Sequence, residues 1–310
     1  MPEGLIIKAL SGYYYVLSMD QGAVESIQCR ARGIFKKKGI TPLVGDRVIY
    51  ELTENGEGTV DEVLPRTSEL IRPPVANVEL VVLVFSIDEP ALNLQLLDKF
   101  LVHAENAGLD TIICLTKSDL VEDNTSERQD EVSPSGGELM LPDVVKLYEN
   151  IGYQVVVTSS KQGEGIEAIF DRLAGSISVF AGQSGVGKSS LLNAMVPGLT
   201  LETNAISNKL GRGKHTTRHV ELIRLHNGGL VADTPGFSQL DFIEIEVEHL
   251  GSCFAEFASY AANCKFRGCL HLHEPECKVI EARDKGEIAP SRYEHYLQFL
   301  GEMKDRKRRY

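Results

Sequence analysis

The sequence predicts a multidomain protein, with a central α/β domain between an N-terminal β-barrel and a C-terminal helical domain that binds zinc. Three observations predict it. Short apolar stretches alternate with turn residues up to about residue 70, long apolar runs then alternate with helical patterns, and three of six cysteines cluster within 264–277. We place the domains at 1–70, 71–243 and 244–310, and 310 residues suit two or three domains.

Residues 1–70 have the pattern of apolar stretches and turn residues that is typical of a small five-stranded barrel. Apolar stretches at Tyr13–Leu17 and Arg47–Leu52 are separated by glycine, proline and asparagine, which is typical of strands joined by turns. Some barrels of this kind bind RNA, but the sequence pattern alone does not distinguish them from other barrels.

The central region alternates buried strands with helices, as in a parallel, doubly wound sheet. An acidic stretch at 121–142, broken by Ser-Pro-Ser-Gly-Gly, predicts a mobile insertion. The predicted strands are Glu79–Phe85, Thr111–Leu115, Gln154–Thr158, Ser176–Ala181, His219–Leu225 and Leu230–Ala232, and the predicted helices are Leu92–Ala107 and Glu164–Leu173.

A glycine-rich segment between the strand Ser176–Ala181 and a predicted helix at Lys188–Met195 fits G-x-x-x-x-G-K-[ST]. Glycines let backbone N–H groups turn inward and surround phosphate oxygens. Lys188 should reach the β- and γ-phosphates, and the Ser189 hydroxyl should bind Mg²⁺. The segment predicted to hold the phosphates is Gly182, Gln183, Ser184, Gly185, Val186, Gly187, Lys188, Ser189 and Ser190.

A second group for the metal follows the strand Leu230–Ala232, in the sequence Asp233-Thr-Pro-Gly236. We expect Asp233 to help hold Mg²⁺ and the Gly236 N–H to meet the γ-phosphate. The alternative is an ordinary turn begun by aspartate, which is a weaker explanation in a chain that also carries a phosphate loop.

Base recognition is predicted by two segments that end consecutive strands. Thr116, Lys117 and Asp119 belong to Thr-Lys-Ser-Asp, and Ser159, Ser160 and Lys161 end the next strand. A carboxylate at Asp119 can accept hydrogen bonds from N1 and the 2-amino group of guanine, whereas adenine would leave it unpaired. The stem of Lys117 can lie along the base plane. The common guanine motif begins with asparagine, and this chain has Thr116 in that place.

The order of these motifs is unusual. Ordinary small GTPases begin with the phosphate loop and end with the guanine motifs, whereas here the guanine motifs come first and Asp233-Thr-Pro-Gly comes last. The order is that of a circular permutation, which is tolerated where chain termini lie close together. The loop after Gly236 then leads into the C-terminal domain, so a nucleotide-dependent ordering of that loop could move the domain.

Cys264, Cys269, His271 and Cys277 have the spacing C-x4-C-x-H-x5-C. Three thiolates and one imidazole suit tetrahedral zinc, and four protein ligands make the site structural. His273 is a competitor for the fourth place. The remaining cysteines are interpreted as buried apolar residues; they are Cys29, Cys114 and Cys253.

These motifs, together with GRGKHTT at 211–217, resemble those of the circularly permuted RsgA (YjeQ) family of GTPases over nearly the whole chain. The resemblance implies an N-terminal OB-fold, a permuted GTPase domain, a zinc domain, GTP and GDP as ligands, and a role in late maturation of the 30S subunit with GTP hydrolysis stimulated by that subunit. By the family pattern, Thr217 rather than Thr216 would bind Mg²⁺ and the γ-phosphate.

The position of the catalytic water depends on residues near Asp233-Thr-Pro-Gly and in GRGKHTT. Many GTPases orient the water with a glutamine just after D-x-x-G, but this chain has Phe237 there, so intrinsic hydrolysis should be slow. His215 could orient the water once its loop is ordered, as proposed for similar proteins. The alternative for His215 is packing or RNA contact.

Charge and hydropathy set limits on partners and location. The net charge of −12 argues against indiscriminate nucleic-acid binding, but basic residues gather at 30–38, 209–218 and 304–309 and could meet phosphates of 16S rRNA. No apolar run is long enough to span a bilayer and no signal peptide is evident, so we expect a cytoplasmic protein with no membrane partner. We also expect it to be a monomer. The alternative functions are an RNA-docking checkpoint module in which GTP is mainly a ligand, and a P-loop ATPase or small-molecule kinase.

Overall fold

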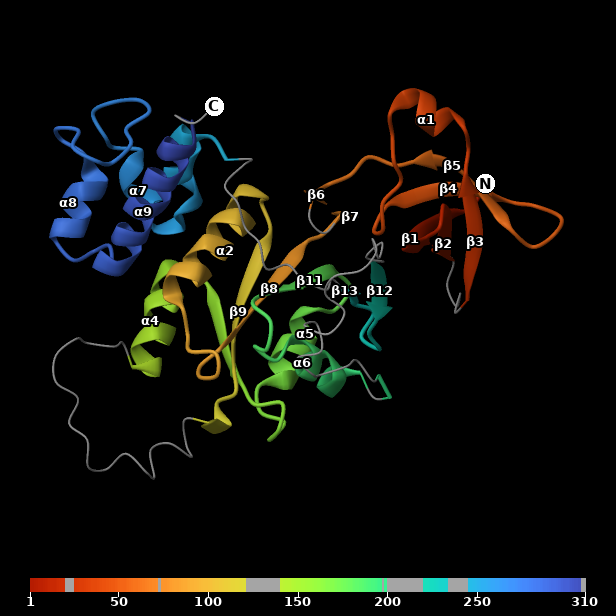
Figure 1. The fold of residues 1–310 in the computed structure, drawn as a ribbon, viewed down its shortest axis with the longest axis horizontal. Coiled ribbons are helices and arrows are strands. Elements are labelled where there is room, and N and C mark those ends of the chain that lie inside the picture. The colour runs from red at the N-terminus through yellow and green to blue at the C-terminus, as the bar shows by residue number, and fades with distance from the viewer. Residues whose placement is uncertain are drawn as a thin grey trace. The chain divides into compact units, whose positions relative to one another are not determined.

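The computed structural model describes residues 1–19, 25–71, 74–120, 140–196, 198–199, 220–233 and 245–307. The chain divides into two compact units, each made of two separate stretches of sequence. Figure 1 colours the ribbon by residue number and labels its elements. The first unit comprises Met1–Val82 and Gly165–Phe237, and the second comprises Leu83–Glu164 and Ser238–Tyr310. The predicted central domain is therefore shared between two units, and the three-domain boundaries stay a prediction.

The N-terminal part of the first unit is a five-stranded barrel, as predicted. Strand β1 pairs with both β2 and β4, β2 pairs with β3, and β5 joins β3 to β4, so the ring closes. Valines 16, 48 and 60 have no exposed surface inside it. The elements are β1 (Glu3–Leu10), β2 (Tyr13–Ser18), β3 (Ser26–Ala31), α1 (Ile34–Lys38), β4 (Arg47–Leu52) and β5 (Gly58–Val63).

The rest of the first unit carries part of the α/β sheet. Strand β11 runs parallel to β13, but β12 runs antiparallel to both β13 and β1. The predicted sheet is thus mixed here, because the short turn at 225–229 can join only antiparallel strands. The elements are β6 (Glu69–Ile71), β7 (Pro74–Ala76), α5 (Ile166–Arg172), β11 (Ile177–Ala181), α6 (Lys188–Met195), β12 (Glu221–Arg224) and β13 (Leu230–Asp233).

The second unit begins within β8 (Leu80–Ser86), whose residues are all buried. It continues through α2 (Leu94–Asn106), β9 (Asp110–Thr116), α4 (Leu141–Ile151) and β10 (Gln154–Thr158). Helix α4 begins inside the stretch predicted as an insertion, because Pro142 lies in its first turn and favours helix initiation there. The rest of that stretch, 121–139, lies outside the described residues.

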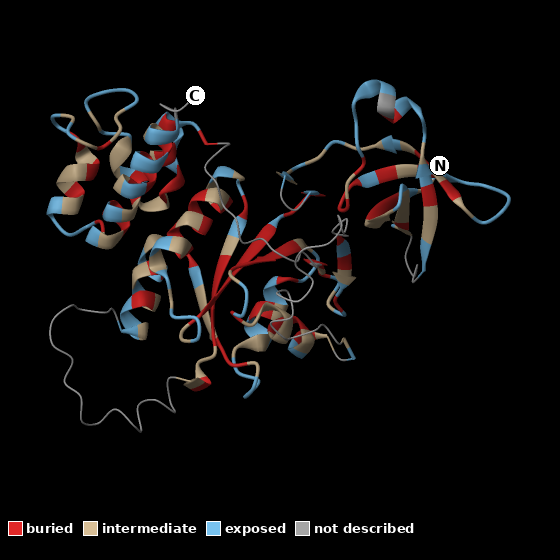
Figure 2. Ribbon diagram, in the orientation of Figure 1, coloured by how far each residue is buried: buried red, intermediate tan, exposed pale blue. Residues whose placement is uncertain are grey.

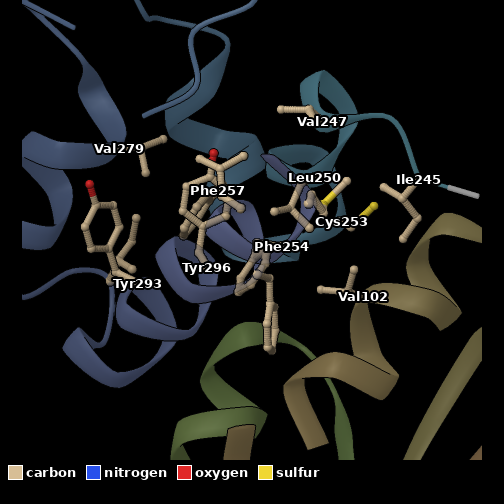
Figure 3. Close-up of a cluster of buried hydrophobic side chains, with 14 of the residues drawn as sticks. Val102, Ile245, Val247, Leu250, Cys253, Phe254, Phe257, Val279, Tyr293 and Tyr296 are labelled. Carbon is tan, nitrogen blue, oxygen red and sulfur yellow. The ribbon is translucent and has the colours of Figure 1, made fainter. Parts of the chain in front are cut away.

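The C-terminal part of the second unit is helical, as predicted, and its core is aromatic. Phe254, Phe257, Tyr296 and Phe299 have no exposed surface, and Val102 of α2 packs into the same cluster (Figure 3). Buried residues also line the inner faces of the helices in Figure 2. The elements are the 3₁₀ helices η3 (Val247–Cys253) and η4 (Ala255–Phe257) and the helices α7 (Ala258–Ala261), α8 (Lys278–Asp284) and α9 (Pro290–Lys307).

A buried ionic network joins α9 to α2. The Arg292 guanidinium donates to both carboxylate oxygens of Glu256 at 2.7 and 2.9 Å. Its Nη1 lies 2.6 Å from Asp98 Oδ1 as an ion pair, without the alignment of a hydrogen bond. Asp98 also accepts a hydrogen bond of 2.7 Å from Tyr148 and pairs with His295.

Within the described part of the chain, no helix has the length and apolar character needed to cross a membrane.

Candidate nucleotide site and metal centre

The two predicted base-recognition segments leave the sheet at the same edge. Strands β9 and β10 are parallel neighbours, and their last residues, Thr116 and Thr158, face each other in the register. The Ser118 N–H donates to the Thr158 carbonyl at 3.2 Å, which binds the two segments together. The structure therefore brings Thr-Lys-Ser-Asp and Ser-Ser-Lys side by side, as the sequence predicts.

The Asp119 carboxylate is held in place by the second segment. Ser159 Oγ donates to Asp119 Oδ1 at 2.7 Å, and the exposed Lys161 ammonium lies 3.8 Å from Oδ2. Asp119 is 9% exposed, so it keeps a small accessible surface. This carboxylate is held through one oxygen and lies near an exposed lysine, and it can still accept the paired N–H donors of guanine.

The hydroxyl of Thr116 makes a hydrogen bond to a neighbouring strand. It is buried at the end of β9, and its Oγ1 donates to the Phe85 carbonyl of β8 at 3.2 Å. The hydroxyl thus ties two strand ends together beneath the base-recognition segment. This contact explains how threonine can occupy the place that asparagine commonly takes.

Lys117 contacts a loop that the sequence did not point to. Its backbone has φ of 63°, a left-handed conformation that costs energy for a residue other than glycine. Its ammonium donates to the Glu89 carbonyl. Because that contact uses a backbone oxygen, no residue pattern could have predicted the role of Glu89. Strained backbone at such a position is typical of ligand-binding loops.

The phosphate loop lies between β11 and α6, as predicted. Gly182, Gly185 and Gly187 all have positive φ, at 148°, 82° and 97°, which only glycine adopts without strain. The α6 N-terminus carries no side-chain cap, and buried Val186 anchors the loop beneath it. Uncapped N–H groups at a helix start are suited to bind phosphate.

Lys188 turns back over this loop. Its ammonium donates to the carbonyls of Gly182 and Gln183 at 2.7 and 2.5 Å. Burial lowers the pKa of Lys188 to about 8, because the ammonium loses hydration there. Phosphate groups at the loop would restore the charged form.

The predicted magnesium ligands are only partly described. Ser189 is the second residue of α6, and Asp233 is the last residue of β13. Strand β13 is the parallel neighbour of β11, with Ala232 opposite Val179, so both ligand-bearing segments leave the same sheet edge. His215, Thr217, Gly236 and Phe237 lie outside the described residues.

The four predicted zinc ligands come together in the second unit. Cys264 Sγ lies 3.9 Å from Cys277 Sγ and 3.8 Å from His271 Nδ1, and the latter two atoms are 3.3 Å apart. All four ligand atoms, Cys269 included, lie within 4.8 Å of one another. Metal–sulfur bonds of about 2.3 Å give tetrahedron edges of about 3.8 Å, so the cluster is compatible with zinc. His273 is exposed and is not in it.

The loop that carries the ligands is organised by a carboxylate. Although burial opposes it, the backbone N–H groups of Leu270, Leu272 and His273 hold the pKa of Glu274 at about 2. Burial raises the pKa of Cys269 to about 12 and lowers that of His271. A bound dication would offset this burial and hold the sulfurs as thiolates. The other three cysteines are buried, as the sequence predicts.

A phosphate-binding loop that follows its base-recognition segments in the chain, on an α/β sheet, defines a circularly permuted P-loop GTPase. The RsgA GTPase family matches residues 63–243, and the RsgA N-terminal domain matches residues 3–60. The chain belongs to the RsgA GTPase family and is a GTP hydrolase.

Relatives and solved structures agree with this assignment over the full length. The small ribosomal subunit biogenesis GTPases RsgA of Bacillus velezensis and Bacillus subtilis are 56% and 53% identical, with complete coverage of both chains. The crystal structure of YloQ, a circularly permuted GTPase, has a TM-score of 0.82 and 49% identity, and covers 100% of this chain and 97% of its own. YjeQ from Thermotoga maritima has a TM-score of 0.81 and 38% identity, covering 97% and 98%.

Proposed function

We propose that this protein uses GTP to control its docking on the small ribosomal subunit and assists the late maturation of that 30S particle. The observation that carries the proposal is full-length identity of 56% to a small ribosomal subunit biogenesis GTPase, in a chain that holds its base-recognition segments in a defined geometry. Such a protein would act in the cytoplasm, and we propose that it acts as a monomer.

In this proposal Asp119 accepts the guanine N–H donors, with Ser159, Ser160 and Lys161 supporting it. The phosphate loop and Lys188 bind the phosphates. Ser189, Thr217 and Asp233 would hold Mg²⁺, which neutralises charge that develops on the phosphate oxygens. The Gly236 N–H would meet the γ-phosphate.

Hydrolysis would wait for the ribosomal partner, because Phe237 stands where a water-orienting glutamine is common. His215 would orient the water after docking orders its loop. If His215→Ala keeps full turnover in the presence of subunits, this role for His215 is wrong.

The flanking regions would recognise 16S rRNA. In the barrel, the Arg30 guanidinium lies 4.6 Å from the centre of the Tyr13 ring, at the rim of a cavity of about 530 Å³ that Arg32 also lines. Arginine and tyrosine are the side chains on which RNA bases stack. In the C-terminal region zinc would stabilise the ligand loop without taking part in hydrolysis.

Co-sedimentation with purified small subunits tests the proposal. The full chain, loaded with a non-hydrolysable GTP analogue, is expected to sediment with small subunits, whereas the GDP-loaded chain is released. Large subunits serve as the matched control. Equal sedimentation with both subunits, or none with either, would contradict the proposal.

A further inference from the structure

A hollow of about 500 Å³ lies on the second unit between α8, α9 and the metal-binding loop. Its basic lining residues are His273, Arg283 and Lys304, one from each of these elements. Its apolar lining includes Tyr293 and Leu300, which are almost wholly buried. Among the described residues that line it, none is acidic. The hollow therefore combines an apolar floor with a positively charged rim.

The arginine on this rim lies over an aromatic ring. The Arg283 guanidinium lies 4.5 Å from the centre of the Tyr293 ring, and the Tyr293 hydroxyl donates to the His271 carbonyl at 2.6 Å. The tyrosine is thus fixed to the metal-binding loop. Arg283 also pairs with Asp284, but Asp284 is 60% exposed, and exposed pairs exchange readily in water. A planar guanidinium in this setting can bind a phosphate or stack on a base.

Gly301 of α9 leaves one wall of the hollow without a side chain. It lies within an 18-residue helix, where glycine is less favourable than alanine. A Cβ at Gly301 would meet no atom within 4 Å, so the surrounding fold does not require glycine there. Glycine does keep that wall of the hollow open, which lets a ligand approach the helix backbone.

The charge pattern favours a polyanion over a single carboxylate. The sequence from Lys304 to Arg309 holds five basic residues and one acidic residue, Asp305, while the whole chain has a net charge of −12. A basic stretch of sequence that includes a residue of the rim suits the phosphates of RNA. An acidic peptide would also match the charge of the rim, and the oligouridylate assay below distinguishes it from RNA.

From these observations we propose that the hollow between α8 and α9 binds one nucleotide of single-stranded RNA, with its phosphate on Arg283 and Lys304. This inference rests on the proposed docking on the small ribosomal subunit, for which it names a contact.

Three variants of the full chain test it: Arg283→Gln, Lys304→Gln and Gly301→Gln, which fills the hollow. The matched control is Lys285→Gln, which removes an exposed charge just after α8 and outside the hollow. Melting temperature and zinc content establish that each variant is folded. Binding is measured to purified small subunits, and to a short fluorescent oligouridylate at several salt concentrations.

Arg283→Gln and Lys304→Gln should each bind subunits about tenfold more weakly, as expected for the loss of one hydrogen bond to a charged group. Gly301→Gln should also weaken binding, because its side chain occupies the hollow. For Arg283→Gln and Lys304→Gln, the slope of log affinity for oligouridylate against log salt should shrink by about 0.7. Lys285→Gln should match the unaltered chain.

The outcomes separate this inference from the proposed function. If the unaltered chain binds no small subunit, the proposed function fails. If it binds subunits and the hollow variants behave like Lys285→Gln, the hollow is not a docking site and the inference is overturned. Loss of subunit binding with unchanged oligouridylate binding would assign the hollow to an acidic protein segment instead of RNA.

Discussion

At the scale of single residues, base choice rests on the Asp119 carboxylate, which Ser159 fixes through one oxygen at 2.7 Å. The distinction between guanine and adenine depends on whether this carboxylate finds two N–H donors. An unpaired acceptor at a site with so little exposed surface is costly, so adenine binding leaves the Asp119 carboxylate unpaired and loses binding free energy.

Replacing Asp119 with asparagine should reverse this preference. The amide can donate to the 2-oxo group of xanthine, so Asp119→Asn should bind GTP about tenfold to a hundredfold more weakly and gain xanthosine triphosphate. Competition binding with both nucleotides measures the change. The control is Asp110→Asn, at the exposed start of β9, the strand that precedes Asp119. An unchanged preference for GTP would remove Asp119 from the base site.

Lys188 links phosphate binding to pH. Its pKa is lowered to about 8 by burial, so above pH 8 the free protein has lost this proton, and bound phosphates draw it back. Nucleotide binding at pH 9 should therefore take up protons, whereas binding at pH 7 should not. Calorimetry in buffers of different ionisation enthalpy measures the uptake. Equal uptake by Lys188→Met, which has no ammonium, would contradict this origin.

At the scale of elements, the C-terminal helices are attached to α2 by charge as well as by apolar packing. Burial alone would lower the pKa of Arg292, but Asp98 and Glu256 raise it above its ordinary value. The guanidinium therefore stays charged between two carboxylates, of which Asp98 has no exposed surface.

Removing this cation should destabilise the second unit. Arg292→Met removes the cation between the buried Asp98 and the largely buried Glu256, a change that costs about 3–5 kcal/mol. Arg306→Met, on the exposed face of the same helix, is the matched control and should be nearly neutral. Thermal unfolding monitored by circular dichroism compares the two. Similar melting temperatures for both variants would mean that the network adds no stability.

Zinc binding should depend on the cysteines of the four-residue cluster and not on the other cysteines. The full chain is expected to hold one zinc ion, and Cys277→Ser should lose it and destabilise the loop that carries the ligands, whereas the buried aromatic cluster keeps the C-terminal helices folded. Cys253→Ser alters a buried cysteine outside the cluster and should keep its zinc. Elemental analysis of both variants decides. Retention of zinc by Cys277→Ser would exclude the four-ligand site.

Prediction from the sequence succeeded where a pattern is local. The strand Gln154–Thr158 and the helix Lys188–Met195 have the predicted limits, because apolar periodicity and glycine mark their ends. It failed where tertiary contacts decide. Helix α4 was missed beside the acidic stretch, the direction of β12 depends on a short turn, and Glu89 contributes only a backbone carbonyl.

At the scale of the whole molecule, the C-terminal helices and the base-recognition segments belong to one compact unit. Asp98 of α2 pairs with α9, and the loop that precedes α2 supplies the Glu89 carbonyl to Lys117. Contacts made by the C-terminal helices can therefore reach the base site through continuous packing within this unit. These contacts are the route by which docking of the C-terminal helices on the ribosomal particle would act on the base site in the proposed function.

The most direct test of the proposed control of GTP hydrolysis by the ribosomal particle is GTP turnover with and without purified small subunits, with Lys188→Ala as the inactive control. We expect slow turnover by the protein alone, a marked increase with small subunits, and no increase with Lys188→Ala. Turnover that is the same with and without subunits at every salt concentration would contradict the proposal, and would favour a docking module for which GTP is mainly a ligand.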